Sequence, residues 1–389
     1  MRVCFITNFI TPYRKTFFEK LCANSGHDWL VLRGKVKQET GRPDYKGSVA
    51  VPTKEIENIE RGFGSFTLRF QKGALSSARS HDPDILILLG MAGNISNWLM
   101  MVWARLTGRR VLIWACGWEP QRAGSMSLWI KKKLMWVYFG MAHKCLLYST
   151  KGMKYLESTG VRRKNLDICF NGIEIDSMIA NEKQILLEAS AIRGRESQPN
   201  AFIFLYVGGL LKEKRIDLLL DAFSSIQLSA PFASLWIVGD GPDGAHVKAY
   251  ADNLKLDRVK FFGRIVEDVD SFFAAADVFV LPGIGGLAFN QAMYWRTPCI
   301  GTEADGTEDD LVIEGKTGFR FEKGDQKSLQ TVMLKAMRLS PMELAEMGAE
   351  ARKVIVEQSN VNQMVSVFNR ALAELDFPRG GRAQSSSRP

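Results

Sequence analysis

The feature that most constrains the fold is a series of short apolar runs that each lead into a glycine turn. These segments are Phe204–Gly209, Leu235–Pro242, Val259–Arg264 and Val278–Gly286. An apolar run of this length before a glycine turn is typical of a buried parallel strand. Because ligands of parallel α/β sheets bind where the carboxyl ends of the strands collect, the four turns predict a shared binding edge.

The turn after the last run predicts a site for a phosphate or diphosphate. Pro282 ends the apolar run, glycines follow at positions 283, 285 and 286, and a helix-compatible segment continues to Met293. Glycine lets backbone N–H groups approach a ligand, and a helix N-terminus offers unpaired donors and a partial positive charge. A purely structural glycine turn is the alternative at this position.

The turn after the first run has the same order of strand, glycine turn and helix, and it is followed by positively charged residues. Lys212, Lys214 and Arg215 follow Gly209 closely, and the amphipathic run Ile216–Phe223 comes next. We therefore expect a second anion-binding turn between a strand and a helix.

The order of these segments resembles family 4 of the retaining glycosyltransferases, also called glycosyl transferases group 1. The segments that carry the resemblance are Val207-Gly-Gly-Leu210 with Lys214, Val238-Gly-Asp-Gly-Pro242, Phe262-Gly-Arg264, Ala276-Asp-Val-Phe-Val-Leu-Pro282, and Gly286-Leu287 with Ala292-Met293. Further matches at Asn171–Asp176, Gly315–Phe319 and Thr11–Arg14 extend it over nearly the whole chain. The resemblance implies an α/β protein of the GT-B architecture, in which two Rossmann-like domains have parallel sheets that face each other across a cleft.

The resemblance also implies the domain organisation. We expect an acceptor-binding domain over residues 1–190, a nucleotide-sugar-binding domain over 191–359, a helix over 360–377 that crosses back to the first domain, and a disordered tail over 378–389. The polar stretch 193–200 is interpreted as the linker. In the first domain, strand-like runs near 2–7, 28–33, 84–89, 110–115 and 144–148 alternate with helix-like segments near 14–24, 65–80, 96–107, 126–140 and 151–159, as in a parallel sheet.

The donor site that the resemblance implies lies in the second domain. Lys214 stands where the family has the lysine that faces the donor diphosphate. Gly283 and Gln291 stand where the family has two glutamates, and Gly209 stands where it has an arginine. Gln291 still offers an amide oxygen to a ribose hydroxyl, but it carries no charge. The expected substrate-binding residues are Gly209, Gly239, Gly241, Pro242, Gly263, Arg264, Gly283, Gly285, Gly286, Leu287, Asn290 and Gln291.

The implied reaction is transfer of a sugar from a nucleotide-diphosphate sugar to a glycan or lipid-linked acceptor, with retention of configuration, in cell-surface polysaccharide biosynthesis. The departing diphosphate needs stabilisation of its negative charge. Lys214 and the backbone N–H groups of residues 285–287 would supply it without a metal or another cofactor. Front-face attack, in which a leaving-group oxygen takes the acceptor proton, requires no protein nucleophile.

Glu119 is the second catalytic candidate. It is the only acid between Asp84 and Glu157, and it follows the expected strand Val111–Ala115. We expect it to orient a hydroxyl of the acceptor or donor. A surface carboxylate beside neighbouring arginines is the alternative.

Basic residues concentrate in the first half of the chain. Residues 1–190 carry a net charge of +12 and residues 191–389 carry −3, consistent with +9 for the whole chain. The densest segment combines Lys131, Lys132 and Lys133 with Trp129, Trp136, Tyr138 and Phe139. This combination predicts contact with an anionic membrane surface or a lipid-diphosphate acceptor, and a core helix with a solvated lysine face is the alternative. No recognised nucleic-acid motif is present, so nucleic acid is not an expected partner.

The remaining features predict a cytoplasmic protein that is peripheral on the inner face of the membrane. The cysteines have no metal-binding spacing and are interpreted as small buried residues of a reducing compartment. Met1–Thr7 is an expected strand without a secretory pattern. The uncharged run 85–104 is long enough to span a bilayer, but turn residues within 90–97 divide it into a strand and a helix.

Two other classes of protein have similar folds. A nucleotide-sugar epimerase would need acid and base groups near the sugar, and no such constellation stands out. A catalytically silent subunit of a polysaccharide-assembly complex is the stronger alternative, because Gly209, Gly283 and Gln291 depart from the family pattern. Slow release of nucleotide diphosphate without an acceptor would separate an active enzyme from a silent subunit.

Overall fold

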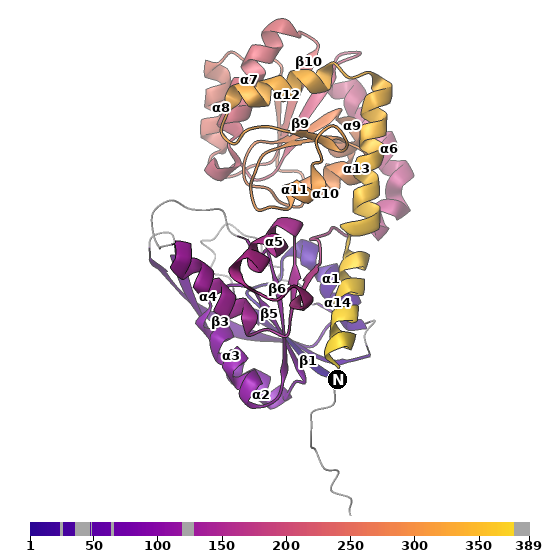
Figure 1. Cartoon of the computed structure of the whole chain (residues 1–389). Coiled ribbons are helices and arrows are strands. Elements are labelled where there is room, and N and C mark those ends of the chain that lie inside the picture. Colours follow the sequence, from indigo (N-terminus) through magenta and orange to yellow (C-terminus); the bar gives the residue numbers. More distant parts are fainter. Residues whose placement is uncertain (24–25, 36–46, 48, 64–65, 119–127, 377–389) are drawn as a thin grey trace, which may run out of the picture. The chain divides into compact units, whose positions relative to one another are not determined.

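The computed structural model describes residues 1–389 apart from 24–25, 36–46, 48, 64–65, 119–127 and 377–389. The chain forms two compact units (Figure 1). The first consists of Met1–Cys169 and the C-terminal segment that begins at Val361, and the second is Phe170–Asn360. Both are α/β structures built on sheets that are mainly parallel, which confirms the predicted fold class.

The structure places the boundary between the units earlier than position 190/191. Helix α6 (Asp176–Glu196) spans the expected boundary and part of the polar stretch that was interpreted as a linker. Its residues Met178 and Ile192 are buried in the core of the second unit. Helix α6 also packs against α9 (Val269–Ala275), so it belongs to the second unit over its whole length.

The first unit has a sheet of eight strands in the order β4-β3-β2-β1-β5-β6-β7-β8. They are β1 (Arg2–Thr7), β2 (Asp28–Gly34), β3 (Thr53–Phe63), β4 (Phe66–Lys72), β5 (Ile85–Leu89), β6 (Arg110–Ala115), β7 (Lys144–Leu147) and β8 (Leu166–Ile168). Neighbouring strands are parallel except β3 and β4, which form an antiparallel pair. The expected helix over 65–80 is therefore wrong in its first half. There, apolar residues alternate with polar ones at the period of a strand.

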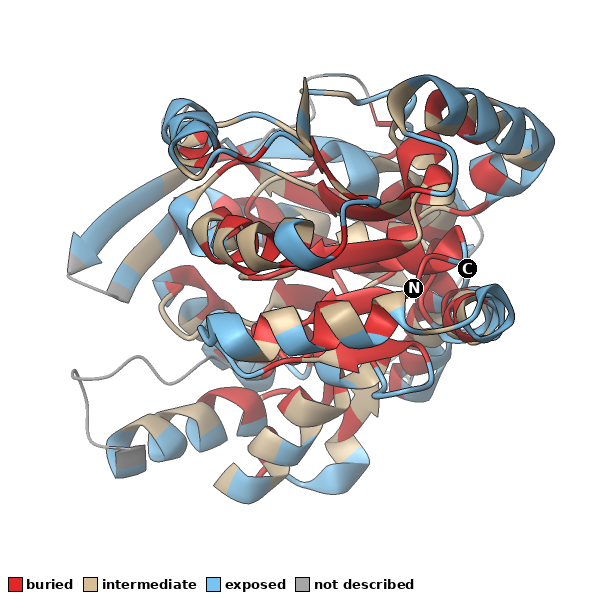
Figure 2. Ribbon diagram, turned by 90° about the horizontal axis from the view of Figure 1, so that it is seen from above, coloured by how far each residue is buried: buried red, intermediate tan, exposed pale blue. Residues whose placement is uncertain are grey.

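The two faces of this sheet are covered by different helices. Val3 and Phe5 share a core with α1 (Lys15–Ala23) and α14 (Val361–Leu375). Cys4 and Ile6, which alternate with them along β1, belong to the core on the opposite face. The helices over that face are α2 (Ala74–His81), α3 (Ile95–Leu106), α4 (Leu128–Gly140) and α5 (Thr150–Thr159). Figure 2 shows the central strands of the sheets as mostly buried, whereas the β3–β4 pair is largely exposed.

Helix α14 is part of the first unit although it follows the second along the chain. Phe368 is buried, and its ring stacks on Phe5 with the centroids 6.2 Å apart. The Lys144 ammonium donates to Glu374 at 2.7 Å, and the Lys20 ammonium donates to Asn362 at 2.8 Å. Both apolar and polar contacts therefore hold this helix on the sheet.

The uncharged run 85–104 forms strand β5, a turn and most of helix α3, as the turn residues indicate. The Asn94 side chain accepts from the Ser96 N–H and caps the helix. Among the described residues, no helix has both the length and the apolar character needed to cross a membrane.

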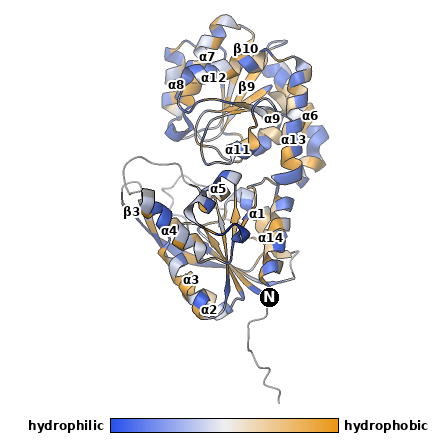
Figure 3. Ribbon diagram, viewed as in Figure 1, coloured by the Kyte–Doolittle hydropathy of each residue, from blue (hydrophilic) through white to orange (hydrophobic). Residues whose placement is uncertain are grey.

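The second unit has a parallel sheet of six strands in the order β11-β10-β9-β12-β13-β14. They are β9 (Phe202–Val207), β10 (Ala233–Val238), β11 (Val259–Gly263), β12 (Val278–Leu281), β13 (Cys299–Gly301) and β14 (Gly318–Arg320). The four apolar runs of the sequence analysis are thus strands β9 to β12. Its other helices are α7 (Ile216–Ser229), α8 (Gly244–Asn253), α10 (Ala288–Tyr294), α11 (Glu308–Leu311), α12 (Gln326–Met337) and α13 (Pro341–Gln358). Figure 3 shows hydrophobic residues gathered on the central strands of both units.

Candidate functional site

The turns after β9 and β12 are bonded to each other at the carboxyl edge of the second sheet. The Lys214 ammonium donates to the carbonyl oxygens of Ile284 at 2.6 Å and Gly285 at 3.1 Å. The Ile284 N–H donates to the Glu213 carbonyl at 3.0 Å. Strands β9 and β12 are direct neighbours, which explains how residues seventy positions apart meet. The structure therefore brings Lys214 and the glycine loop together.

Burial lowers the pKa of Lys214, while the nearby carboxylates of Glu213 and Asp305 act in the opposite direction. Two of the three ammonium protons are taken by the loop carbonyls, and one remains for another acceptor. In a trans peptide the C=O and the following N–H point in opposite directions. Because both carbonyls face Lys214, the N–H groups of Gly285 and Gly286 point away from it, toward the other side of the loop.

Gly283 permits the close approach of the two turns. A Cβ at this position would lie 2.5 Å from the Lys214 carbonyl carbon, and closer still to the Glu213 oxygen. A glutamate here would displace the backbone that positions Lys214. Gly209 is different, because its added Cβ would meet the Leu211 side chain at 3.7 Å and the Asp240 carbonyl oxygen at 3.9 Å, which are ordinary van der Waals contacts.

The glycines after β10 also serve close packing. Gly239 has φ +144°, and a Cβ on it would overlap the Gly208 carbonyl. A Cβ on Gly241 would lie 2.5 Å from the Leu210 oxygen. These residues bring the turns after β9 and β10 into contact, which is consistent with a shared binding edge.

Polar residues of helix α10 contact other residues of the second unit. Asn290 is buried, and its amide donates to the Ser359 hydroxyl at 2.8 Å and to the Asn171 carbonyl at 3.1 Å. Burial raises the pKa of Asp270, and hydrogen bonds from Trp295 and Gln291 oppose that shift. The Gln291 side chain therefore lies near the Asp270 carboxyl group. Roles for Asn290 and Gln291 in substrate binding stay predictions.

The other expected site residues differ in accessibility. Pro242, Arg264 and Gly286 are exposed, and Leu287 is half-buried. Gly263 has φ +70°, which favours glycine. Glu119 lies outside the described residues, as does the tail 378–389. Within the described residues, no group of three or more His, Cys, Asp or Glu side chains is placed to hold a metal ion.

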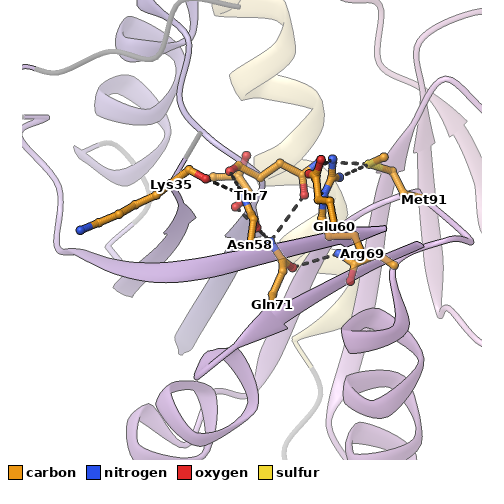
Figure 4. A network of polar contacts seen from close by, with 9 residues as sticks. Thr7, Lys35, Asn58, Glu60, Arg69, Gln71 and Met91 are labelled. Carbon is orange, nitrogen blue, oxygen red and sulfur yellow. Dashed lines mark hydrogen bonds and ion pairs between the residues drawn. The ribbon is translucent and has the colours of Figure 1, made fainter. Parts of the chain in front are cut away.

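In the first unit, a network of amide side chains lies at the carboxyl edge of the sheet, and the sequence analysis missed it (Figure 4). The Gln71 amide donates to the Thr7 carbonyl at 3.4 Å and to Asn58 Oδ1 at 3.2 Å. Asn58 in turn donates to the Asn8 carbonyl at 2.8 Å and to the Lys35 carbonyl at 3.2 Å. The network therefore ties the β3–β4 pair to the loop after β1. It comes from segments distant in the sequence, so no local pattern indicates it.

The predicted membrane segment divides between core and surface. Tyr138 and Phe139 of α4 are buried, whereas Trp129 and Trp136 are 66% and 47% exposed. Lys133 lies over the Trp129 ring, with the ammonium 4.9 Å from its centroid. Helix α3 lies beside α4, since the Trp98 and Tyr138 rings are 5.0 Å apart. The exposed apolar residues of the two helices are Ile95, Leu99, Val102, Leu106, Trp129, Ile130, Trp136 and Val137.

The part of the second unit that contains these turns also matches a known family in sequence. Residues 190–354 match the sequence profile of glycosyl transferases group 1. This region contains Lys214, the glycine loop and helix α10.

Three curated relatives are similar over parts of their length. N-acetyl-alpha-D-glucosaminyl L-malate synthase of Bacillus anthracis is 29% identical over 170 residues, 43% of this chain and 44% of the relative. Alpha-monoglucosyldiacylglycerol synthase of Acholeplasma laidlawii is 28% identical over 39% of this chain and 37% of the relative. The capsular polysaccharide biosynthesis glycosyltransferase CapM of Staphylococcus aureus is 30% identical over 33% of this chain and 34% of the relative. The chain thus matches less than half the length of each.

Solved structures are similar over nearly the whole chain. HepE of Anabaena in complex with UDP has a TM-score of 0.73 at 15% identity, over 96% of this chain and 100% of that chain. The lipopolysaccharide biosynthesis glycosyltransferase WaaG has a TM-score of 0.62 at 16% identity, over 95% and 99%. At these identities the similarity establishes the fold, which is that of GT-B glycosyltransferases.

Proposed function

We propose that this protein is a retaining, metal-independent glycosyltransferase of family 4. It moves a sugar from a nucleotide-diphosphate sugar to a glycan or lipid-linked acceptor in cell-surface polysaccharide biosynthesis. The observation that carries the proposal is the contact between Lys214 and the glycine loop, inside the region that matches glycosyl transferases group 1. The HepE complexes with UDP and UDP-glucose support a nucleotide-diphosphate donor. The similarity to CapM, a capsular polysaccharide biosynthesis glycosyltransferase, supports a role in polysaccharide synthesis.

In this mechanism the second unit stabilises the leaving diphosphate. Lys214 holds the loop carbonyls, so that the N–H groups of Gly285 and Gly286 are oriented before the donor arrives. Donors that are already oriented stabilise developing charge without reorganisation during the reaction. The Lys214 ammonium lies on the other side of the loop, and its positive charge attracts the diphosphate. A leaving-group oxygen takes the acceptor proton as the sugar is transferred to the same face.

We further propose that the protein is cytoplasmic and binds the inner face of an anionic membrane through helices α3 and α4. The observation that favours this partner is that both helices carry exposed apolar side chains and that α4 adds the exposed lysines 132 and 133. Tryptophan side chains insert at the headgroup level, and lysines near them attract anionic lipids. The name of the Acholeplasma laidlawii relative, a diacylglycerol glycolipid synthase, supports an acceptor at a membrane.

A catalytically silent subunit of a polysaccharide-assembly complex is the second candidate. It is favoured by the uncharged side chain of Gln291, which lies near Asp270, and by the absence of a side chain at Gly283. The two candidates predict the same fold and the same affinity for nucleotides. They differ in turnover.

A donor screen tests the proposal. Thermal unfolding is measured with a panel of nucleoside diphosphates and their sugars, because a ligand present at 100 times its Kd stabilises a protein by about 2.7 kcal/mol. The donor that binds is then incubated without acceptor, and release of nucleoside diphosphate is followed. An active enzyme releases it slowly, and a silent subunit binds without release. If no nucleoside diphosphate or sugar nucleotide raises the unfolding temperature, both candidates are wrong.

A further inference from the structure

The loop after β1 contains Arg14, which contacts only uncharged groups among the residues that the structure describes. The Arg14 guanidinium lies over the Trp114 ring, 4.4 Å from its centroid, and 5.6 Å from that of Tyr13. Its Nη1 points to the Met364 sulfur at 3.8 Å. In the part of the chain that the structure describes, no carboxylate forms an ion pair with Arg14. A half-buried guanidinium without a carboxylate is available to an anion from outside the protein.

The surroundings of Arg14 contain buried polar atoms that the protein itself leaves unsatisfied. Among the described residues, neither the Trp114 Nε1 nor the Thr11 Oγ1 has a hydrogen-bond partner. Leaving a buried polar atom unpaired costs about 1–3 kcal/mol, so such atoms tend to mark functional sites or places for water and ions. Burial raises the pKa of Tyr148, and Arg14 opposes that shift. The Tyr148 phenol therefore stays protonated near Arg14 and can donate a hydrogen bond to an anion.

The position of Arg14 is fixed from both sides. Its N–H donates to the Thr11 carbonyl at 2.9 Å and closes the turn after β1. The amide network of Figure 4 holds the start of the same loop, through Asn58 on the Asn8 carbonyl and Gln71 on the Thr7 carbonyl. Below the guanidinium, Trp114 is 3% exposed and packs against Phe17 and Phe368. Fixing a binding group in advance lowers the entropy that a ligand must lose on binding.

Arg14 lies in the segment after β1, Trp114 is the penultimate residue of β6, and Tyr148 follows β7. All three therefore lie at the carboxyl edge of the first sheet. Ligands of parallel sheets bind at this edge. We propose that Arg14 binds an oxyanion, a phosphate or carboxylate group carried by the acceptor near the hydroxyl that receives the sugar. The inference rests on the proposed function and narrows its acceptor class to anionic glycans and glycolipids. Arginine suits this role because its planar fork pairs with two oxygens of one anion.

The test compares acceptors that differ only in charge. The donor identified by the screen is offered with a neutral sugar acceptor, the corresponding uronic acid and the corresponding sugar phosphate. We expect the parent to prefer one or both charged acceptors. Arg14→Gln should lower kcat/KM for the preferred charged acceptor by about 10- to 150-fold relative to the neutral one, which is the range of a charged hydrogen bond. Comparing the uronic acid with the sugar phosphate shows whether the site binds a carboxylate or a phosphate.

Two further variants complete the test. Arg14→Lys keeps the charge but loses the planar fork, so its kcat/KM should fall between those of the parent and Arg14→Gln. Arg79→Gln is the control, because Arg79 also lies over a tryptophan, Trp103, but in the last turn of α2, away from the carboxyl edge. Its acceptor preference should match that of the parent. Equal use of charged and neutral acceptors by the parent would overturn the inference, as would an equal loss on both with Arg14→Gln.

Direct binding separates this inference from the proposed function. Thermal unfolding with sodium glucuronate, inorganic phosphate or glucose is measured for the parent, Arg14→Lys and Arg79→Gln. The anion site is supported if glucuronate or phosphate, but not glucose, raises the unfolding temperature and if this effect is weaker only in Arg14→Lys. This result supports the site even if the parent turns over no donor. Stabilisation by either anion that is equal in all three proteins, or absent from all three, overturns it even if the parent is an active transferase.

Discussion

Replacing Gly283 by alanine should loosen the contact between the two turns of the donor site. The added Cβ would lie 2.5 Å from the Lys214 carbonyl carbon, whereas two carbon atoms in contact prefer about 3.5–4.0 Å. One turn must therefore move by about 1 Å. The obstructing atoms belong to the backbone of Glu213 and Lys214, which cannot turn aside as a flexible side chain could.

Overpacking of this kind costs about 1–3 kcal/mol. For a unit of this size, 1 kcal/mol corresponds to roughly 2–4 °C in Tm, so Gly283→Ala should lower the Tm of the second unit by roughly 2–12 °C. Gly286→Ala is the matched control. Gly286 lies in the same loop, but a Cβ on it would have nothing within 4 Å. We expect the control to change stability by less than about 0.5 kcal/mol.

The assay must report on the second unit alone, because a chain with two units need not unfold in a single step. Hydrogen exchange of peptides that cover 202–215 and 278–295 meets this need. Both should exchange faster in Gly283→Ala than in Gly286→Ala, while peptides from the first unit should not differ. The same variant should bind nucleoside diphosphate more weakly, because Lys214 no longer holds the loop. Identical exchange in the two alanine variants would refute the steric reasoning.

Three further outcomes follow from the structure. Lys214→Ala should raise the donor KM and lower turnover by about tenfold or more while the protein stays folded, and unchanged kinetics would contradict the diphosphate assignment. Changing lysines 131–133 together to Gln should reduce binding to anionic vesicles by orders of magnitude, because each lysine near the membrane surface contributes about 1 kcal/mol. If the variant co-sediments with the vesicles as well as the parent does, these lysines are only a solvated helix face. Burial, together with the charges of Arg110 and Arg105, lowers the pKa of His143 from 6.5 to about 4. The unfolded chain therefore binds a proton at this histidine more readily than the folded chain does. The stability that the neutral ring contributes is lost as pH falls from 6.5 toward 4. With allowance for partial exposure, His143→Gln should remove about 1–2 kcal/mol of the stability difference between pH 7 and pH 5, measured by urea unfolding, and an unchanged difference would contradict it.

Features encoded locally could be predicted from the sequence. Strands β9 to β12 are mainly apolar runs that lead into glycine turns, and both signals lie within a few residues. The helix caps are equally local, as at Asn94 and Ser340. Strand β4 was mistaken for part of a helix because its alternation is short and runs into the true helix α2.

Features that depend on contacts between distant segments could not be predicted. The sequence shows a glycine at position 283, but not that the Glu213–Lys214 backbone fills the space beside it. Asn290 follows the glycine loop and was expected to contact substrate, yet the structure gives it buried partners at Ser359 and Asn171. The polar stretch near residue 195 looked like a linker because exposed helix ends and linkers have similar compositions.

The path of the chain has a consequence for synthesis on the ribosome. The second unit is inserted into the first, since Cys169 and Val361 bound it on either side. Phe368 of α14 covers Phe5 and Trp114, which precede the second unit in the chain and are translated long before α14. The second unit is therefore complete before the first, and the residues of β1 and β6 leave the ribosome well before they reach their final environment. Until then the apolar face of the first sheet lacks its C-terminal helix, and this incomplete sheet is the species that a nascent-chain chaperone would encounter.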